Sequence, residues 1–106
     1  MPDVDSRLKH DSLVIQTAVK LRSHGWIVKA RIPEWFEEPD VLNGYRPDII
    51  AQRGNEFLVV EVKKGPIDHP KIVALTLFVT SHPNYQLHVL ELNDSSESLH
   101  SLRNAG

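Results

Sequence analysis

The chain has 106 residues, of which 41% are hydrophobic and 25% charged, an ordinary composition for a globular protein. It contains no cysteine, which excludes disulfide bonds and thiolate metal sites, and its net charge of −2 is unlike that of a strongly basic nucleic-acid-binding module. It shows no apolar run as long as a membrane span and no secretory signal pattern, so we expect one cytoplasmic domain over residues 1–106.

A helix is predicted from about Ser6 to His24, because apolar residues recur at helical spacing and Gly25 stands where a helix typically stops. The apolar stripe consists of Leu8, Val14, Ile15, Ala18 and Leu21. Asp11 falls in the middle of this stripe, which is unusual for an acid. Two explanations stay open: Asp11 points to a functional site, or the helix begins near residue 11 with Asp11 as its N-cap.

A strand is predicted over Trp26–Ile32, which is rich in β-branched and aromatic residues, and alternate residues from Trp26 should face the core. Pro33 ends this strand and opens a long loop that continues to Tyr45. Loops of this length are often functional. The alternative is a surface excursion whose Trp35 and Phe36 pack at the edge of the core.

Two apolar runs, Ile49–Gln52 and Phe57–Val62, flank the dipeptide Gly54-Asn55. This arrangement is typical of a hairpin with a two-residue primed turn. Such a turn pairs Arg53 with Glu56 and thereby sets the register of both strands.

In that register Asp48 lies directly opposite Glu61, with the two Cβ atoms about 5 Å apart. Lys63 lies two residues beyond Glu61 and shares its face. The second strand is apolar on both faces, so it should be a buried central strand. Ionised groups on such a strand are costly unless they are paired or hold a metal.

After the hairpin, Pro70 suits the first position of a helix, with Asp68 or His69 as its cap, and Pro83 should end that helix. A strand follows over Gln86–Leu92.

A strand–helix–strand unit makes the last strand parallel to the second strand of the hairpin. A short C-terminal helix is predicted around Ser95–Arg103. The predicted fold class is α/β, in the order helix, three-strand meander, helix, strand, with a mixed sheet flanked by helices.

Two close carboxylates and a lysine suit metal-assisted hydrolysis of a phosphodiester bond. Carboxylate oxygens are hard ligands for Mg²⁺ or Mn²⁺. The metal makes water more acidic and screens charge on the phosphoryl group, and a lysine can orient that water or stabilise developing negative charge. The alternative is a plain hairpin with an internal Asp–Lys or Glu–Lys ion pair.

Pro47-Asp48 followed by Glu61-Val62-Lys63 resembles the motif of the PD-(D/E)XK nuclease superfamily. Within it, the chain is most similar to archaeal Holliday-junction-resolvase-like and restriction-endonuclease-like domains, over roughly residues 6–92. The resemblance implies a restriction-endonuclease-like core and a Mg²⁺- or Mn²⁺-dependent endonuclease acting on DNA, with junction or branched DNA among its candidate substrates. It also implies that Asp48, Glu61 and the Val62 carbonyl bind the metal and that Lys63 assists the attacking water.

Resolvase-like members usually carry a Glu on the first helix, but the matching position here is near Ile15. Asp11, one turn earlier, is the candidate third ligand. Candidate phosphate contacts are the basic residues near the motif, namely Arg46, Lys64, His69 and Lys71. Each of these is also explained as a solvated side chain. The remaining histidines, His10 among them, show no metal-ligand spacing and are predicted to be ordinary.

The alternative function is a nuclease-fold module that binds nucleic acid or a protein partner with weak or no activity. Small size, acidic charge and the missing helix Glu favour this alternative, whereas the intact acid pair and lysine favour the nuclease. RNA as a substrate stays open.

A homodimer or larger complex is expected, because a lone chain of this size offers little surface to grip duplex DNA and two strands need two sites. The first helix and the Pro33–Tyr45 loop are the expected contact regions.

Overall fold

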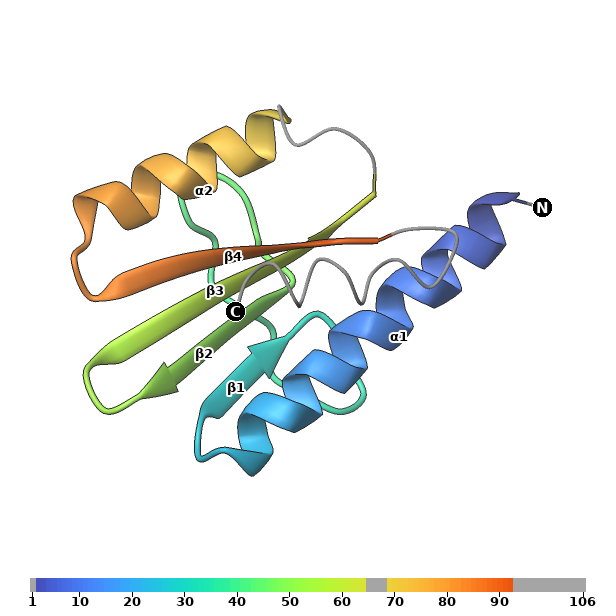
Figure 1. The fold of residues 1–106 in the computed structure, drawn as a ribbon, viewed down its shortest axis with the longest axis horizontal. Helices are drawn as coiled ribbons and strands as arrows, with labels where there is room; N and C mark the ends of the chain where they lie inside the picture. Colours follow the sequence, from blue (N-terminus) through green and yellow to red (C-terminus); the bar gives the residue numbers. More distant parts are fainter. Residues whose placement is uncertain (1, 65–68, 93–106) are drawn as a thin grey trace.

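A computed structural model describes residues 2–64 and 69–92 of the chain (Figure 1). In chain order the elements are α1 (Pro2–Ser23), β1 (Ile27–Ala30), β2 (Ile49–Arg53), β3 (Glu56–Lys63), α2 (Pro70–Ser81) and β4 (Tyr85–Glu91). The strands form one sheet in the order β1-β2-β3-β4. β1, β2 and β3 run antiparallel and β4 runs parallel to β3, which confirms the predicted mixed sheet flanked by helices. The helix predicted around Ser95–Arg103 lies outside the described residues.

α1 begins at Pro2, earlier than the predicted Ser6, and a proline is readily accommodated in the first turn of a helix. Asp11 therefore lies well inside the helix, and the alternative in which it caps the N-terminus is wrong. Leu8, assigned to the apolar stripe, is 63% exposed, because this half of α1 extends past the end of the sheet (Figure 1).

The end of α1 follows from Gly25, which adopts a positive φ of 90°. The Trp26 N–H donates to the Leu21 carbonyl and the Gly25 N–H to the Arg22 carbonyl, each at 3.1 Å. This is the hydrogen-bond pattern of a Schellman motif, and it turns the chain directly into β1.

The hairpin of β2 and β3 has the predicted register, with Arg53 paired with Glu56 and Ile49 with Val60. Gly54 has a positive φ of 62° and Asn55 does not, which is the φ pattern of a type II′ turn. Its twist matches that of the flanking strands, so the local sequence is enough to set the pairing.

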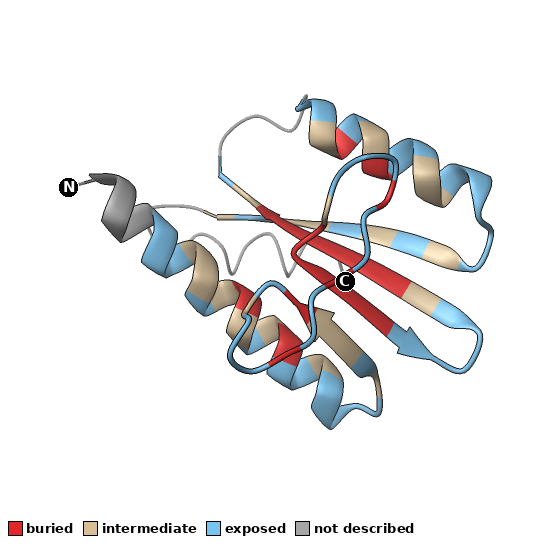
Figure 2. Cartoon of the chain, turned by 180° about the vertical axis from the view of Figure 1, so that it is seen from behind, coloured by how far each residue is buried: buried red, intermediate tan, exposed pale blue. Residues whose placement is uncertain are grey.

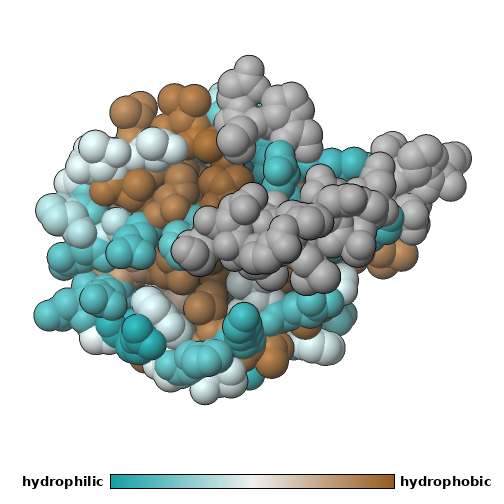
Figure 3. Space-filling view, in the orientation of Figure 1, coloured by the Kyte–Doolittle hydropathy of each residue, from teal (hydrophilic) through white to brown (hydrophobic). Residues whose placement is uncertain are grey.

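The two faces of the sheet carry separate cores, and the central strands are the most deeply buried (Figure 2). The core between the sheet and α1 consists mainly of Val14, Ala18, Ala30, Ile49, Ala51, Leu58, Val60 and Val62. The core between the sheet and α2 consists of the buried residues Leu42, Ile50, Val59 and Leu75. Apolar surface remains visible over α2 (Figure 3), where Val73 and Leu77 are exposed.

In the long loop between β1 and β2, one of the two aromatic residues expected at the edge of the core packs there: Phe36 is buried, whereas Trp35 is 61% exposed. Asn43 and Gly44 both have positive φ and make a tight turn that Leu42 and Tyr45 close. The Asn43 amide donates to the Ala74 carbonyl of α2 at 3.0 Å and ties the loop to that helix.

α2 begins as predicted at Pro70, and of the two predicted caps the structure shows His69, whose Nδ1 accepts from the Lys71 N–H at 3.1 Å. Asp68, the other candidate, lies outside the described residues. Within the described ranges, neither helix is long and apolar enough to cross a membrane.

Candidate active site at the end of the central strands

Asp48 and Glu61 lie side by side where β2 begins and β3 ends, one position beyond the last ladder pair. Both are buried, with 3% and 5% of their surface exposed. The Asp48 N–H donates to Glu61 Oε1 at 3.1 Å. By strand alternation the pair lies on the face that carries Ile50 and Val59, so the structure brings the two acids together as the register predicts.

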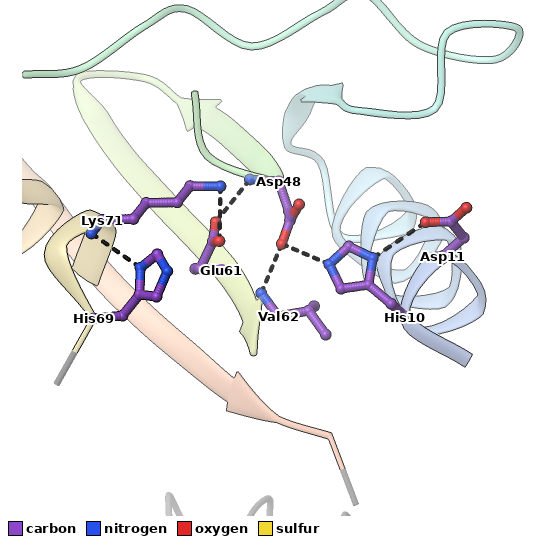
Figure 4. Close-up of polar contacts among 7 residues, drawn as sticks. All are labelled: His10, Asp11, Asp48, Glu61, Val62, His69 and Lys71. Atoms are coloured by element: carbon purple, nitrogen blue, oxygen red, sulfur yellow. Dashed lines mark hydrogen bonds and ion pairs between the residues drawn. The ribbon is translucent and has the colours of Figure 1, made fainter. Parts of the chain in front are cut away.

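Pro47 explains how Asp48 reaches its neighbour strand. In register it stands opposite Val62, at a position where an antiparallel ladder would exchange two backbone hydrogen bonds. Pro47 has no N–H to donate to the Val62 carbonyl. The Val62 N–H instead donates to Asp48 Oδ2 at 2.8 Å, which fixes the carboxylate (Figure 4).

His10 of α1 joins the site from the other side of the sheet end (Figure 4). Its Nε2 donates to Asp48 Oδ2 at 3.2 Å and its Nδ1 to Asp11 Oδ1 at 3.1 Å. Asp11 thus contacts the acid pair through His10 rather than directly. Its side chain is 47% exposed.

Lys71, from the first turn of α2, makes an ion pair with Glu61, with Nζ 2.8 Å from Glu61 Oε2. The two side chains are only 15% and 7% exposed. Lys63 shares the face of Glu61 by alternation, but in the described part of the chain no ion pair joins it to either acid. The lysine next to Glu61 is therefore Lys71, which lies on a different element.

These residues line an open cavity of about 520 Å³. Its lining consists of Arg7, His10, Asp11, Arg31, Asp48, Glu61, Lys64, Lys71 and Leu92. Another cavity, of about 480 Å³, lies between α1 and the sheet, but it is mostly apolar and no carboxylate lines it. The buried carboxylate pair therefore lies in the first cavity and not in the second.

The charges of the site depend on one another. Burial raises the pKa of Glu61, the neighbouring Asp48 charge raises it further, and Lys71 offsets part of this. Burial opposes ionisation of Asp48 too, but hydrogen bonds from His10 and Val62 and nearby positive charges hold its pKa below the usual range. The hydrogen bond to Asp48 raises the pKa of His10 to about 9, against the effect of burial. His10 is therefore an imidazolium at neutral pH.

The other predicted site residues are distributed unevenly. Lys64 and Lys71 line the cavity. His69 serves as the cap of α2, and Arg46 lies with Nη1 3.5 Å from Glu38 and also donates to the Pro39 carbonyl, away from the cavity.

Sequence reasoning missed His10. A signal for it existed, because Val14 and Ala18 are the most buried positions of α1 and one further step of four residues toward the N-terminus gives His10.

Within residues 2–64 and 69–92, no three His, Cys, Asp or Glu side chains gather as a metal-binding group. The acid pair alone is a set of two hard oxygen ligands. Mg²⁺ is commonly held by one or two carboxylates and keeps several waters, so this set fits Mg²⁺ better than a metal that needs four protein ligands.

A family model for restriction-endonuclease-like proteins, described as AHJR-like, matches residues 4–105. No curated protein and no solved structure gives a significant match. The match agrees with the order of helices and strands, and this family suggests nuclease activity. The chain belongs to the AHJR-like family of restriction-endonuclease-like proteins.

Proposed function

We propose that the chain is a divalent-metal-dependent nuclease that hydrolyses phosphodiester bonds within DNA. One observation carries the proposal: Asp48 and Glu61, buried and adjacent, form the floor of an open cavity lined by basic side chains. Buried like charges are rare without a functional reason, and clustered carboxylates in a cleft are typical of catalytic sites.

The metal would be held by Asp48, Glu61 and the Val62 carbonyl. In an extended strand the N–H and C=O of one residue point to the same side, so the Val62 carbonyl shares the side of its N–H, next to Asp48. Pro47 offers that carbonyl no N–H, which supports its role as a ligand. Asp11 stays the candidate third ligand, and its Oδ1 is bonded to His10. A bound Mg²⁺ or Mn²⁺ would make water more acidic and screen the charge of the phosphoryl group.

The protein groups around the acids support distinct roles. The Val62 N–H and His10 both hold Oδ2 of Asp48, which orients the carboxylate toward the cavity. Lys71 places a positive charge where negative charge develops on the phosphoryl oxygens. Lys63 has the water-assisting role that the family motif implies, and Lys71 is the second candidate for it.

The alternative proposal is a binding module without activity. The Lys71–Glu61 ion pair favours it, because a lysine at 2.8 Å neutralises one acid without any metal. The two proposals differ in whether a divalent cation replaces that lysine.

We propose that residues 1–106 form one domain and that two copies associate, so that each strand of a duplex meets one site. Large apolar side chains are exposed in both regions where contact was expected. On α1 and the long loop these are Leu8, Val19, Trp35, Val41 and Tyr45. Apolar surface of this kind often marks a protein–protein contact.

Titration calorimetry with Mn²⁺ tests the metal site. The titration of wild type should show a heat of binding and that of Glu61→Gln should not. Glu56→Gln, at an exposed acid next to the hairpin turn, should behave as wild type. Cleavage is then assayed on single-stranded, duplex and branched DNA and on RNA. No heat from wild type, or equal heat from Glu61→Gln, contradicts the proposal.

A further inference from the structure

The cavity has two layers of charge. Asp48, Glu61, His10 and Lys71 form the floor; their side chains are at most 32% exposed, and each is bonded to another member. Arg7, Arg31 and Lys64 form the rim and are exposed. Asp11, the remaining acid of the lining, is bonded to His10. The rim therefore consists of three basic side chains around the opening of the cavity.

The two rim arginines differ from the other arginines of the described chain. Elsewhere the guanidinium groups have partners inside the fold: Arg22 lies over the ring of Phe36, Arg53 over the ring of Trp26, and Arg46 beside Glu38. Among the described residues, the side chains of Arg7 and Arg31 have no such ion pair, hydrogen bond or ring contact. The arginines away from the cavity thus contact other side chains of the fold, whereas the guanidinium groups of Arg7 and Arg31 are available to a ligand.

The three rim residues come from separate parts of the chain. The Arg31 N–H donates to the Asp48 carbonyl at 2.9 Å, which places Arg31 beside the acid pair. Arg7 lies one helical turn before His10 and Asp11, on the same face of α1. Lys64 directly follows β3. Cations from three separate parts of the chain thus line the cavity that contains the acid pair.

We infer that Arg7, Arg31 and Lys64 bind the phosphodiester backbone on either side of the phosphate that reaches the floor. A guanidinium group binds a phosphate through two parallel N–H···O bonds, and a lysine contributes a point charge. Such contacts position a strand without reading its bases. This inference rests on the proposed nuclease function and adds to it a binding step that requires no metal.

Salt dependence measures these contacts directly, because each neutralised phosphate contributes a slope of about −0.9 to a plot of log K against log salt for duplex DNA. Three contacts predict that the affinity of wild type falls about 40-fold between about 50 and 200 mM KCl, whereas one contact predicts about fourfold. Fluorescence anisotropy with labelled duplexes of unrelated sequence, in EDTA, gives these values.

Arg7→Gln/Arg31→Gln should show the shallow salt dependence, and Arg7→Lys/Arg31→Lys should keep the steep one. Arg22→Gln/Arg53→Gln removes two arginines away from the cavity and should match wild type. Circular dichroism checks that every variant is folded. The inference is overturned by a wild type that does not bind in EDTA, or by a Gln variant as salt-dependent as wild type.

Mn²⁺ titration of the same preparations separates the two proposals. If wild type binds Mn²⁺ and cleaves DNA but the Gln variant keeps the salt slope of wild type, phosphate binding by the rim is refuted and the nuclease proposal stands. A slope that falls as expected, without metal heat in wild type, supports the rim and refutes the metal-dependent nuclease.

Discussion

Lys71→Met removes the ammonium group that lies 2.8 Å from Glu61 Oε2 in an ion pair whose side chains are 15% and 7% exposed. Breaking a buried ion pair by removing one partner costs about 3–5 kcal/mol of unfolding free energy. Because burial and the Asp48 charge already raise the pKa of Glu61, proton uptake by Glu61 keeps the loss near the lower end, about 3 kcal/mol. At about 4–8 °C per kcal/mol for a domain of this size, the thermal midpoint in EDTA should fall by about 12–24 °C.

Divalent metal should reverse much of this loss if the acid pair is a metal site. Mg²⁺ at about 100 times its Kd stabilises the folded state by about 2.7 kcal/mol. It should raise the midpoint of Lys71→Met more than that of wild type, where Mg²⁺ must compete with Lys71 for Glu61. Lys29→Met is the matched control, because it removes only an exposed ion pair with Asp40, at 3.7 Å. Such a pair contributes about 0–1 kcal/mol to the unfolding free energy.

Two results would refute this reasoning in different ways. If Lys71→Met unfolds like wild type in EDTA, the ion pair does not stabilise the fold. If its midpoint is low in EDTA and equally low in Mg²⁺, the pair is structural and the acids hold no metal. The double variant Lys71→Met/Glu61→Gln should lose less stability than Lys71→Met alone, because it leaves no unpaired buried charge.

Lys63→Ala should keep the heat of Mn²⁺ binding and lower the cleavage rate by ~10²-fold, the scale expected for the loss of one electrostatic group. If the variant cleaves as fast as wild type, Lys63 has no part in the mechanism. Lys71→Ala tests the second candidate in the same way. In EDTA, His10 should titrate near pH 9 by NMR, and a value near 6.5 contradicts the Asp48 hydrogen bond. Because folding raises the pKa of His10, the protonated imidazole stabilises the folded state fully below about pH 6.5, and this stabilisation is lost as pH rises through about 9. The unfolding free energy of wild type should therefore fall between these pH values, and that of His10→Gln should not. Light scattering should give a dimer mass that Trp35→Ser reduces, and a fully active monomer refutes the dimer.

The hairpin and its acid pair could be predicted from the sequence because they are local. Gly54-Asn55 determines the turn, the turn determines the register, and the register puts Asp48 opposite Glu61. The parallel arrangement of β3 and β4 also follows locally, because a strand–helix–strand connection has only one common geometry. The fold class was therefore set by short-range patterns of turns and apolar residues.

The rest of the site depended on how α1 and α2 pack against the ends of the sheet. His10 lies on α1, Lys71 on α2 and Arg31 just after β1, and they meet Asp48 and Glu61 only in the folded chain. Periodicity shows which face of a helix is buried, but not how far the helix extends past a sheet or which residue then lies over a strand end. The same limit applies to Trp35 and Phe36, two neighbouring aromatic residues with opposite exposure, because only the path of the loop decides which of them reaches the core.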